Sequence, residues 1–235
     1  MTGIPTTGVF QLGSGLALTV REAGDGEPVL LLHGAAGPDS IDSLLAHFAV
    51  GRHVLAPTHP GWDGTIRPGG MTSVADLAAA YLDLLEQRGL RQATVVGVSF
   101  GGWVAAEMAV RDRDDRVGRL VLIDAIGPQI PGHRPAFPSN APPENIAALR
   151  AYSRNTLEDP TLLDRARLIR IPRLLVWGED DPVVSAEFGR RYADASPGAR
   201  FVLIPGAGHL PMREAPEATF AAIDGFLAAT APGRT

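Results

Sequence analysis

The chain has 235 residues, of which 45% are hydrophobic and 20% charged, a composition typical of a globular protein with one substantial core. Its net charge is −5 and it has no basic run that would neutralise a row of phosphates, so nucleic acid is not an expected partner. It contains no Cys and no Lys, which excludes disulfides, thiolate nucleophiles, sulfur-ligated metals and lysine-bound pyridoxal chemistry.

The segment from Met1 to Phe10 has neither the basic start nor the apolar core of a signal peptide. No later stretch reaches the roughly 18 apolar residues that would span a bilayer. A chain without Cys also suits a reducing compartment. We therefore expect a cytoplasmic protein that has no membrane partner.

Short apolar runs alternate with longer segments of helical spacing, which is typical of βαβ units around a parallel sheet. The predicted strands are 9–12 at an edge, 16–20, 29–33, 53–57, 94–98, 120–124, 174–178 and 201–205. The predicted helices are 41–50, 73–88, 100–110, 185–195 and 216–229. The predicted fold class is α/β, with a mostly parallel sheet of seven or eight strands flanked by helices.

This alternation breaks once, between Gly127 and Ile171, where six prolines from Pro128 to Pro143 precede two short helical patterns. Long Pro-rich insertions in compact domains are usually lids or binding loops. We expect one domain over 1–235, with 128–170 as a short cap.

The segment Gly97-Val98-Ser99-Phe100-Gly101 falls directly after a predicted strand and directly before a predicted helix. This is the context of a nucleophile elbow, a strained turn that raises the serine hydroxyl above the sheet. The flanking glycines remove side chains that would collide with neighbouring elements, and the helix N-terminus favours a developing negative charge. The alternative interpretation is an ordinary N-cap serine in a Gly-rich turn.

A serine hydroxyl becomes a good nucleophile only beside a base, and the base needs a carboxylate to orient it. Two downstream loops supply both groups. An acidic cluster, Glu179-Asp180-Asp181, follows one predicted strand, and a Gly-rich loop after the last predicted strand ends in His209. The order Ser, Asp, His is the order found in α/β-hydrolases.

These motifs resemble the α/β-hydrolase fold superfamily over nearly the whole chain, in the branch that contains cap-bearing esterases and carbon–carbon bond hydrolases. Two further segments carry the resemblance: Leu31-Leu32-His33-Gly34-Ala35-Ala36, similar to the oxyanion loop, and His59-Pro60-Gly61-Trp62-Asp63-Gly64, similar to the loop after the following strand. The resemblance implies a catalytic triad of Ser99, Asp181 and His209, and oxyanion donors at the backbone N–H groups of Ala35 and Phe100.

Asp181 is preferred as the acid because the family aspartate comes three positions after a strand-end glycine, here Gly178. Asp124 also ends a predicted strand at the same edge, and some relatives place the acid there, so it is the alternative. His33 is expected to shape the oxyanion loop rather than to act as a base.

The expected substrate pocket is formed by His33, Gly34, Trp62, Phe137, Tyr152 and Leu210. Leu149 and Leu157 are expected to face it from the cap, with Phe100 below. Because the cap is short, we expect a small pocket that excludes long acyl chains. The remaining histidines show no metal-ligand spacing and no full G-x-G-x-x-G precedes a helix, so we expect no metal and no other cofactor.

The expected activity is hydrolysis of a small ester or related acyl substrate. Leu210 follows His209, where relatives that cleave dienoic diketones often have Trp, and this favours simple esters over carbon–carbon bonds. A thioester, lactone or amide remains an open alternative. So do a slow-turnover ligand receptor and a cofactor-free lyase or cyclase, because one fold hosts many functions. The expected partner is a small molecule, and the sequence leaves open a monomer or a homodimer.

Overall fold

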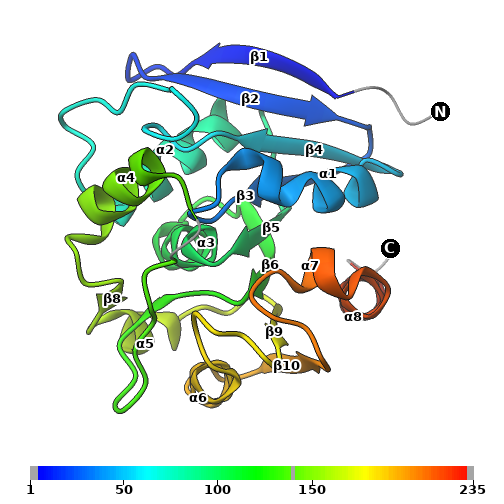
Figure 1. Ribbon diagram of the computed structural model, residues 1–235. Coiled ribbons are helices and arrows are strands. Elements are labelled where there is room, and N and C mark those ends of the chain that lie inside the picture. The colour runs from blue at the N-terminus through cyan, green and yellow to red at the C-terminus, as the bar shows by residue number, and fades with distance from the viewer. Residues whose placement is uncertain (1–4, 139–140, 232–235) are drawn as a thin grey trace.

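The computed structural model describes residues 5–138 and 141–231 (Figure 1). Eight strands form one sheet in the order β1-β2-β4-β3-β5-β6-β9-β10, in which β1, β2 and β4 pair antiparallel and all other neighbours pair parallel. Their bounds are β1 Thr6–Gln11, β2 Ala17–Ala23, β3 Glu27–Leu32, β4 Arg52–Pro57, β5 Ala93–Val98, β6 Val117–Ile123, β9 Arg173–Gly178 and β10 Ala199–Ile204. The predicted fold class is confirmed.

Helices cover both faces of the sheet (Figure 1). Strand residues alternate between the faces, so Leu31 packs with α1 (Asp42–Phe48) and α8 (Pro216–Ala229), while Leu30 and Leu32 pack on the opposite side. That opposite side is covered by α2 (Val74–Gln87), α3 (Phe100–Arg111) and α6 (Ala186–Asp194). The central parallel strands are buried on both faces, which is why their sequences are almost continuously apolar.

The strand register decides where the functional loops begin. Leu32 pairs with Gly97, Val98 with Ile123, and Gly178 with Ile204, so β3, β5, β6, β9 and β10 all end at one edge. The loops that follow these five strands therefore meet above that edge.

Several short elements were not predicted. A 3-10 turn, η1 (Pro38–Ile41), precedes α1, so the helix expected over 41–50 is shorter than its apolar pattern. Helix α7 (Pro211–Glu214) follows His209 directly. Strands β7 (Gly127–Pro128) and β8 (Glu158–Asp159) pair with each other, and their two-residue length gives no periodic signal in the sequence.

Two helices, α4 (Pro143–Ser153) and α5 (Leu162–Ala166), occupy the insertion between β6 and β9. Tyr152 of α4 is buried, stacks on Trp62 at 5.9 Å between ring centroids, and donates a hydrogen bond of 3.0 Å to the carbonyl of Pro60. Trp62 stacks in turn on Phe100 at 5.6 Å, at the start of α3. An aromatic stack thus joins the insertion to the rest of the fold.

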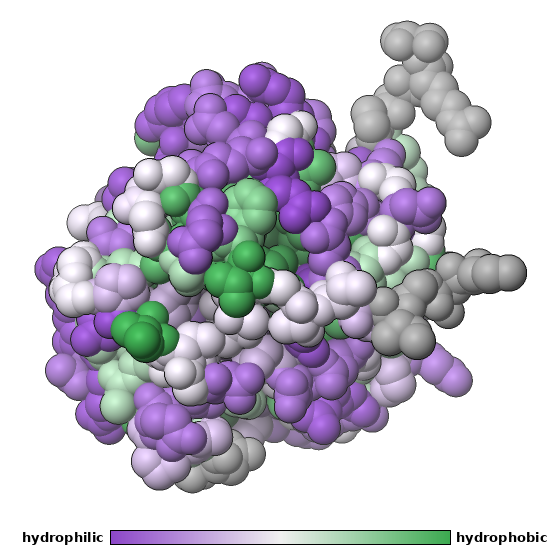
Figure 2. Space-filling view, turned by 90° about the horizontal axis from the view of Figure 1, so that it is seen from above, coloured by the Kyte–Doolittle hydropathy of each residue, from purple (hydrophilic) through white to green (hydrophobic). Residues whose placement is uncertain are grey.

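The surface seen from above in Figure 2 is mostly polar, with apolar residues in small separate areas. Scattered apolar side chains are usual on globular proteins. Within the described residues, no helix combines the length and the apolar character needed to cross a membrane.

The aromatic stack predicts that two substitutions of Tyr152 lower the free energy of unfolding by different amounts. Tyr152→Phe removes only the hydrogen bond to Pro60 and should lower the free energy of unfolding by about 1 kcal/mol. Tyr152→Ala also removes the ring between the insertion and Trp62 and should cost about 3 to 5 kcal/mol. Urea unfolding measures both, and equal losses in the two variants would show that the ring adds nothing to the junction.

Candidate active site

Ser99 occupies the turn between β5 and α3 with φ 53° and ψ −114°, a conformation that is strained for any residue with a side chain. A Cβ on Gly97 would come within 2.3 Å of the Gly101 carbonyl, and a Cβ on Gly101 within 2.2 Å of the Leu32 carbonyl. Both glycines are therefore sterically required, as expected of a nucleophile elbow. The turn leaves the Ser99 hydroxyl at the edge where the strands end.

Ser99, His209 and Asp181 form a continuous chain of hydrogen bonds. His209 Nδ1 lies 2.7 Å from Asp181 Oδ2, and His209 Nε2 lies 2.9 Å from Ser99 Oγ. Because a carboxylate only accepts, Nδ1 carries the proton and Nε2 is free to accept from the serine hydroxyl. This geometry fits a base that takes the proton of a nucleophile.

Backbone N–H groups fix the carboxylate end of this chain. Asp181 Oδ1 accepts from the N–H groups of Val183 at 2.7 Å and Val184 at 3.0 Å, and the side chain of Asp181 is fully buried. Its other oxygen is thereby aimed at His209.

Glu214 of α7 holds the loop that carries His209. Its two carboxylate oxygens accept from the N–H groups of Gly208 at 2.7 Å and Leu210 at 3.1 Å, on either side of the histidine. This role was not predicted, because one glutamate after a Gly-rich loop is no distinctive signal.

Gly34 brings the loop after β3 against Ser99, since a Cβ at this position would lie 3.0 Å from Ser99 Cβ. The N–H groups of Ala35 and Phe100 donate no hydrogen bond within the described part of the chain, which leaves both available to a bound group. The carbonyl of Ala35 accepts from Trp62 Nε1 at 3.3 Å and from Asn145 Nδ2 at 3.1 Å. Asn145 belongs to α4, and no sequence pattern singled it out.

Beneath this loop lies a fully buried pair of histidines. The His59 backbone N–H donates to His33 Nε2 at 3.0 Å, and His59 Nε2 donates to the His33 carbonyl at 2.9 Å. His33 Nδ1 faces the Gly34 carbonyl at 2.8 Å, and His59 Nδ1 accepts from the Tyr81 hydroxyl at 2.5 Å. The His33 ring thus bonds the loop backbone and not Ser99, which agrees with a shaping role.

Burial lowers the pKa of both rings, that of His33 to about 4, and backbone hydrogen bonds oppose the shift only in part. Both histidines are therefore neutral near pH 7, and their hydrogen bonds assign the Nδ1–H form to His33 and the Nε2–H form to His59.

A cavity of about 610 Å³ opens above Ser99. Its lining residues come from the strand-end loops and the start of the insertion: Gly34, Ala35, Ala36, Ser40, Val98, Ser99, Ala136, Phe137, Pro138, Ala141, Asp180, Pro182, Val183, Gly206, Gly208, His209, Leu210 and Glu214. Two of them, Asp180 and Glu214, are acidic, and none of these described lining residues is arginine.

The predicted pocket is partly wrong. Gly34, Phe137 and Leu210 line the cavity, but His33, Trp62 and Tyr152 do not. These three are buried beneath it, because Trp62 packs between Tyr152 and Phe100 while His33 bonds His59. Three other residues expected at the pocket, Phe100, Leu149 and Leu157, are likewise buried and line no part of it.

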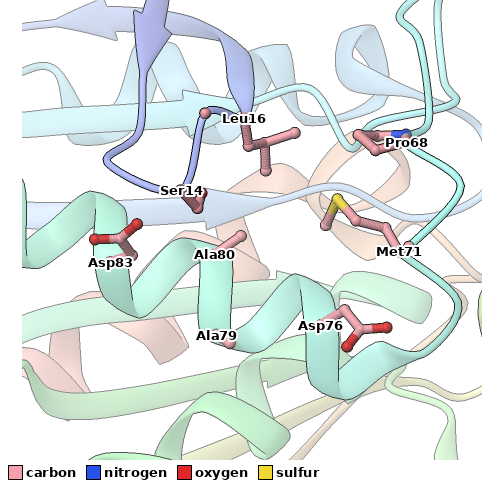
Figure 3. A pocket seen from close by; sticks show the side chains of 10 residues that line it. Ser14, Leu16, Pro68, Met71, Asp76, Ala79, Ala80 and Asp83 are labelled. Atoms are coloured by element: carbon pink, nitrogen blue, oxygen red, sulfur yellow. The ribbon is translucent and has the colours of Figure 1, made fainter.

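A second hollow, of about 540 Å³, lies between the β1–β2 turn and α2 (Figure 3). Its two carboxylates are engaged within α2: Asp76 accepts from the backbone of Ser73 at the helix start, and Asp83 accepts from Gln87. None of its lining residues lines the cavity above Ser99.

Asp124, the alternative acid, lies beneath the site. It is fully buried, and its Oδ1 accepts from the Gly178 N–H at 2.8 Å. Among the described residues, Asp124, Asp181 and His209 each bring one metal-binding atom within 4.8 Å of the others. Both ring nitrogens of His209 are already bonded, so a metal held by this histidine would displace its bond to Asp181 or to Ser99.

The two buried histidines should stay neutral when exposed ones protonate. At about pH 5.5 an exposed histidine, with a pKa of about 6.5, is mostly charged. Nitrogen NMR of the imidazole rings should then find His33 neutral with hydrogen on Nδ1 and His59 neutral with hydrogen on Nε2. A midpoint near pH 6.5 for either ring would contradict the buried network.

Comparison with known proteins agrees with this architecture. A model described as alpha/beta hydrolase fold matches residues 27–157, and a second, described as alpha/beta hydrolase family, matches residues 141–223. The chain is 32% identical over 167 residues to a 2-hydroxymuconate semialdehyde hydrolase of Pseudomonas putida, a match covering 66% of this chain and 58% of that protein. It is 30% identical over 271 residues to BpoC, a candidate non-heme bromoperoxidase of Mycobacterium tuberculosis, over 90% of this chain and 97% of that protein.

Among solved structures, an esterase from Exiguobacterium antarcticum superposes with a TM-score of 0.80 at 18% identity, over 95% of this chain and 100% of that one. This likeness concerns the fold. Together with the family models and the sequence relatives, it shows that the chain belongs to the alpha/beta hydrolase fold family.

Proposed function

We propose that the chain is a serine hydrolase that cleaves small, uncharged carboxylic esters through an acyl-enzyme on Ser99. The observation that carries this proposal is the hydrogen-bonded chain Ser99–His209–Asp181 at the floor of the cavity. With it we propose residues 128–170 as the cap of a single hydrolase domain.

In the first half of the reaction, His209 Nε2 takes the proton of Ser99 Oγ as that oxygen attacks the ester carbonyl. The N–H groups of Ala35 and Phe100 donate to the oxyanion that forms, and Asp181 stabilises the imidazolium. The C–O bond to the alcohol then breaks, and His209 returns the proton to the leaving oxygen.

The second half repeats these steps with water. His209 takes a proton from water as its oxygen attacks the acyl carbonyl, the bond to Ser99 Oγ breaks, and the serine recovers its proton. The products are a carboxylic acid and an alcohol, and the protein ends as it began.

Hydrolysis of a carbon–carbon bond is the second candidate, because one relative is a 2-hydroxymuconate semialdehyde hydrolase. The name of that substrate denotes a carboxylate. In this chain the described residues around the cavity supply Asp180 and Glu214 but no arginine, so an anionic substrate would meet like charge without a counter-ion. The negative charge around the cavity therefore supports an uncharged ester as the substrate.

Replacing the nucleophile tests the proposal. Ser99→Ala should lower ester turnover by as much as about a millionfold while the free energy of unfolding stays close to that of the parent chain. A fluorophosphonate should label the parent chain at one site and leave Ser99→Ala unlabelled, and Ser43→Ala on α1 should label normally. Near-normal turnover in Ser99→Ala would contradict the assignment, and labelling without turnover of any ester would favour a ligand receptor.

The cavity also predicts substrate size and charge. We expect the kcat/KM on nitrophenyl esters to peak between acetyl and butyryl and to decline by octanoyl, because a cap as short as residues 128–170 should leave little room for a long acyl chain beside Ser99. A nitrophenyl ester with a terminal carboxylate should react at least about tenfold more slowly than a neutral ester of equal length.

Asp180→Asn removes an exposed carboxylate from the cavity lining. This variant should reduce the difference in rate between the neutral and the anionic ester, and added salt should do the same. A preference for decanoyl or dodecanoyl esters would show that the cavity is an open groove. Faster reaction of the anionic ester would favour the carbon–carbon bond candidate.

A further inference from the structure

Two carboxyl groups meet directly beneath His209. Asp124 follows β6 and Asp181 follows β9, and these strands are parallel neighbours that end at the same edge. A carboxyl oxygen of Asp124 lies within 4.8 Å of a carboxyl oxygen of Asp181. Asp124 also has φ 44°, a left-handed conformation that costs energy for a residue with a side chain, and it turns the chain sharply at the end of β6.

Two carboxylates that lie this close in a buried site repel each other. The repulsion favours the protonated, neutral form of one of them. Hydrogen-bond donors show which one. Asp181 accepts from three N–H groups, those of Val183, Val184 and His209. Among the described residues, Asp124 accepts from the N–H of Gly178 alone. Hydrogen bonds to a charged oxygen favour ionisation, so the negative charge belongs on Asp181.

The second oxygen of Asp124 supports the same assignment. Asp124 Oδ2 is buried and has no hydrogen-bond donor facing it among the described residues. An ionised oxygen in that position would lose its hydration without compensation. A protonated one becomes a donor, and the neighbouring carboxylate of Asp181 is its acceptor.

We propose that Asp124 is a neutral carboxylic acid that donates a hydrogen bond to Asp181, and that it acts as a positioning residue for the Asp181–His209 pair. The pair of carboxyls then carries one negative charge in place of two. Burial, with Asp181 and Glu214 nearby, raises the pKa of Asp124 well above its usual range, in agreement with the contacts. The proposal concerns the triad described under the proposed function and rests on it.

A single charge suits a base that must also return its proton. A second carboxylate beside His209 would favour a charged imidazolium over the neutral ring that must accept the serine proton. Among the described residues, the ionisable groups that bear on Asp124 are Asp181 after β9, His209 after β10 and Glu214 on α7.

Four variants separate the roles. Asp124→Asn keeps the shape of a neutral acid and retains a donor toward Asp181 and an acceptor for Gly178. Asp124→Ala removes both. Asp164→Asn makes the same chemical change on an exposed side chain of α5 and serves as the control. Asp181→Asn, which leaves His209 without its orienting carboxylate, should cost on the order of ten-thousandfold in kcat.

The first readout is the rate of fluorophosphonate labelling as a function of pH, which needs the triad but no natural substrate. Asp124→Asn should lower the rate less than about tenfold and leave the acidic limb at the same pH, while Asp124→Ala should lower it by about tenfold or more. If Asp124 were ionised, Asp124→Asn would instead move the acidic limb down by about one pH unit or more, and this result would overturn the proposal.

The second readout is the free energy of unfolding. Above about pH 4 the unfolded chain releases the proton of Asp124 and the folded chain keeps it, so the parent chain should lose stability relative to Asp124→Asn as the pH rises toward 7. A difference that is independent of pH, or that grows in favour of the parent, would overturn the proposal. This measurement does not involve Ser99, so a failure of the hydrolase assignment alone leaves it interpretable.

Discussion

The hydrogen bond between His209 Nε2 and Ser99 Oγ joins residues 110 positions apart, and it exists only because parallel strands end at one edge of the sheet. Ser99 follows β5, Asp181 follows β9 and His209 follows β10, and the register sets the ends of these strands level. Parallel pairing requires crossover helices, and these helices bury both faces of the strands. The apolar core and the site therefore have the same cause.

The insertion between β6 and β9 contributes to the site from below as well as from above. Its Asn145 holds the carbonyl of Ala35, and its Tyr152 stacks on Trp62, which bonds the same carbonyl. The loop that faces Ser99 is thus held by side chains of a segment more than a hundred positions later in the chain. A change in the packing of this insertion should therefore also move the loop after β3 that contains Ala35.

Local patterns were enough to predict the strands of the eight-stranded sheet, the elbow and the meeting of Ser99, Asp181 and His209. Their signals lie within a few residues: an apolar run, two glycines around a serine, or a polar residue after a strand. Asn145 and Glu214 were missed because their importance comes from distant backbone partners that no short pattern records. Trp62 and Tyr152 were misplaced because an aromatic residue gives no indication of whether a cavity or another ring faces it. Asp124 and Asp181 were weighed as alternatives, and the parallel pairing of β6 with β9 brings both to one place.

In the proposed reaction an acyl group passes through Ser99. Rapid acid quenching during turnover of nitrophenyl butyrate, followed by proteolysis and mass spectrometry, detects that intermediate directly. We expect a butyryl group on the peptide that contains Ser99, present during turnover and gone when the substrate is exhausted. Continued release of nitrophenol with no acyl group on that peptide, or with the group on another residue, would contradict it.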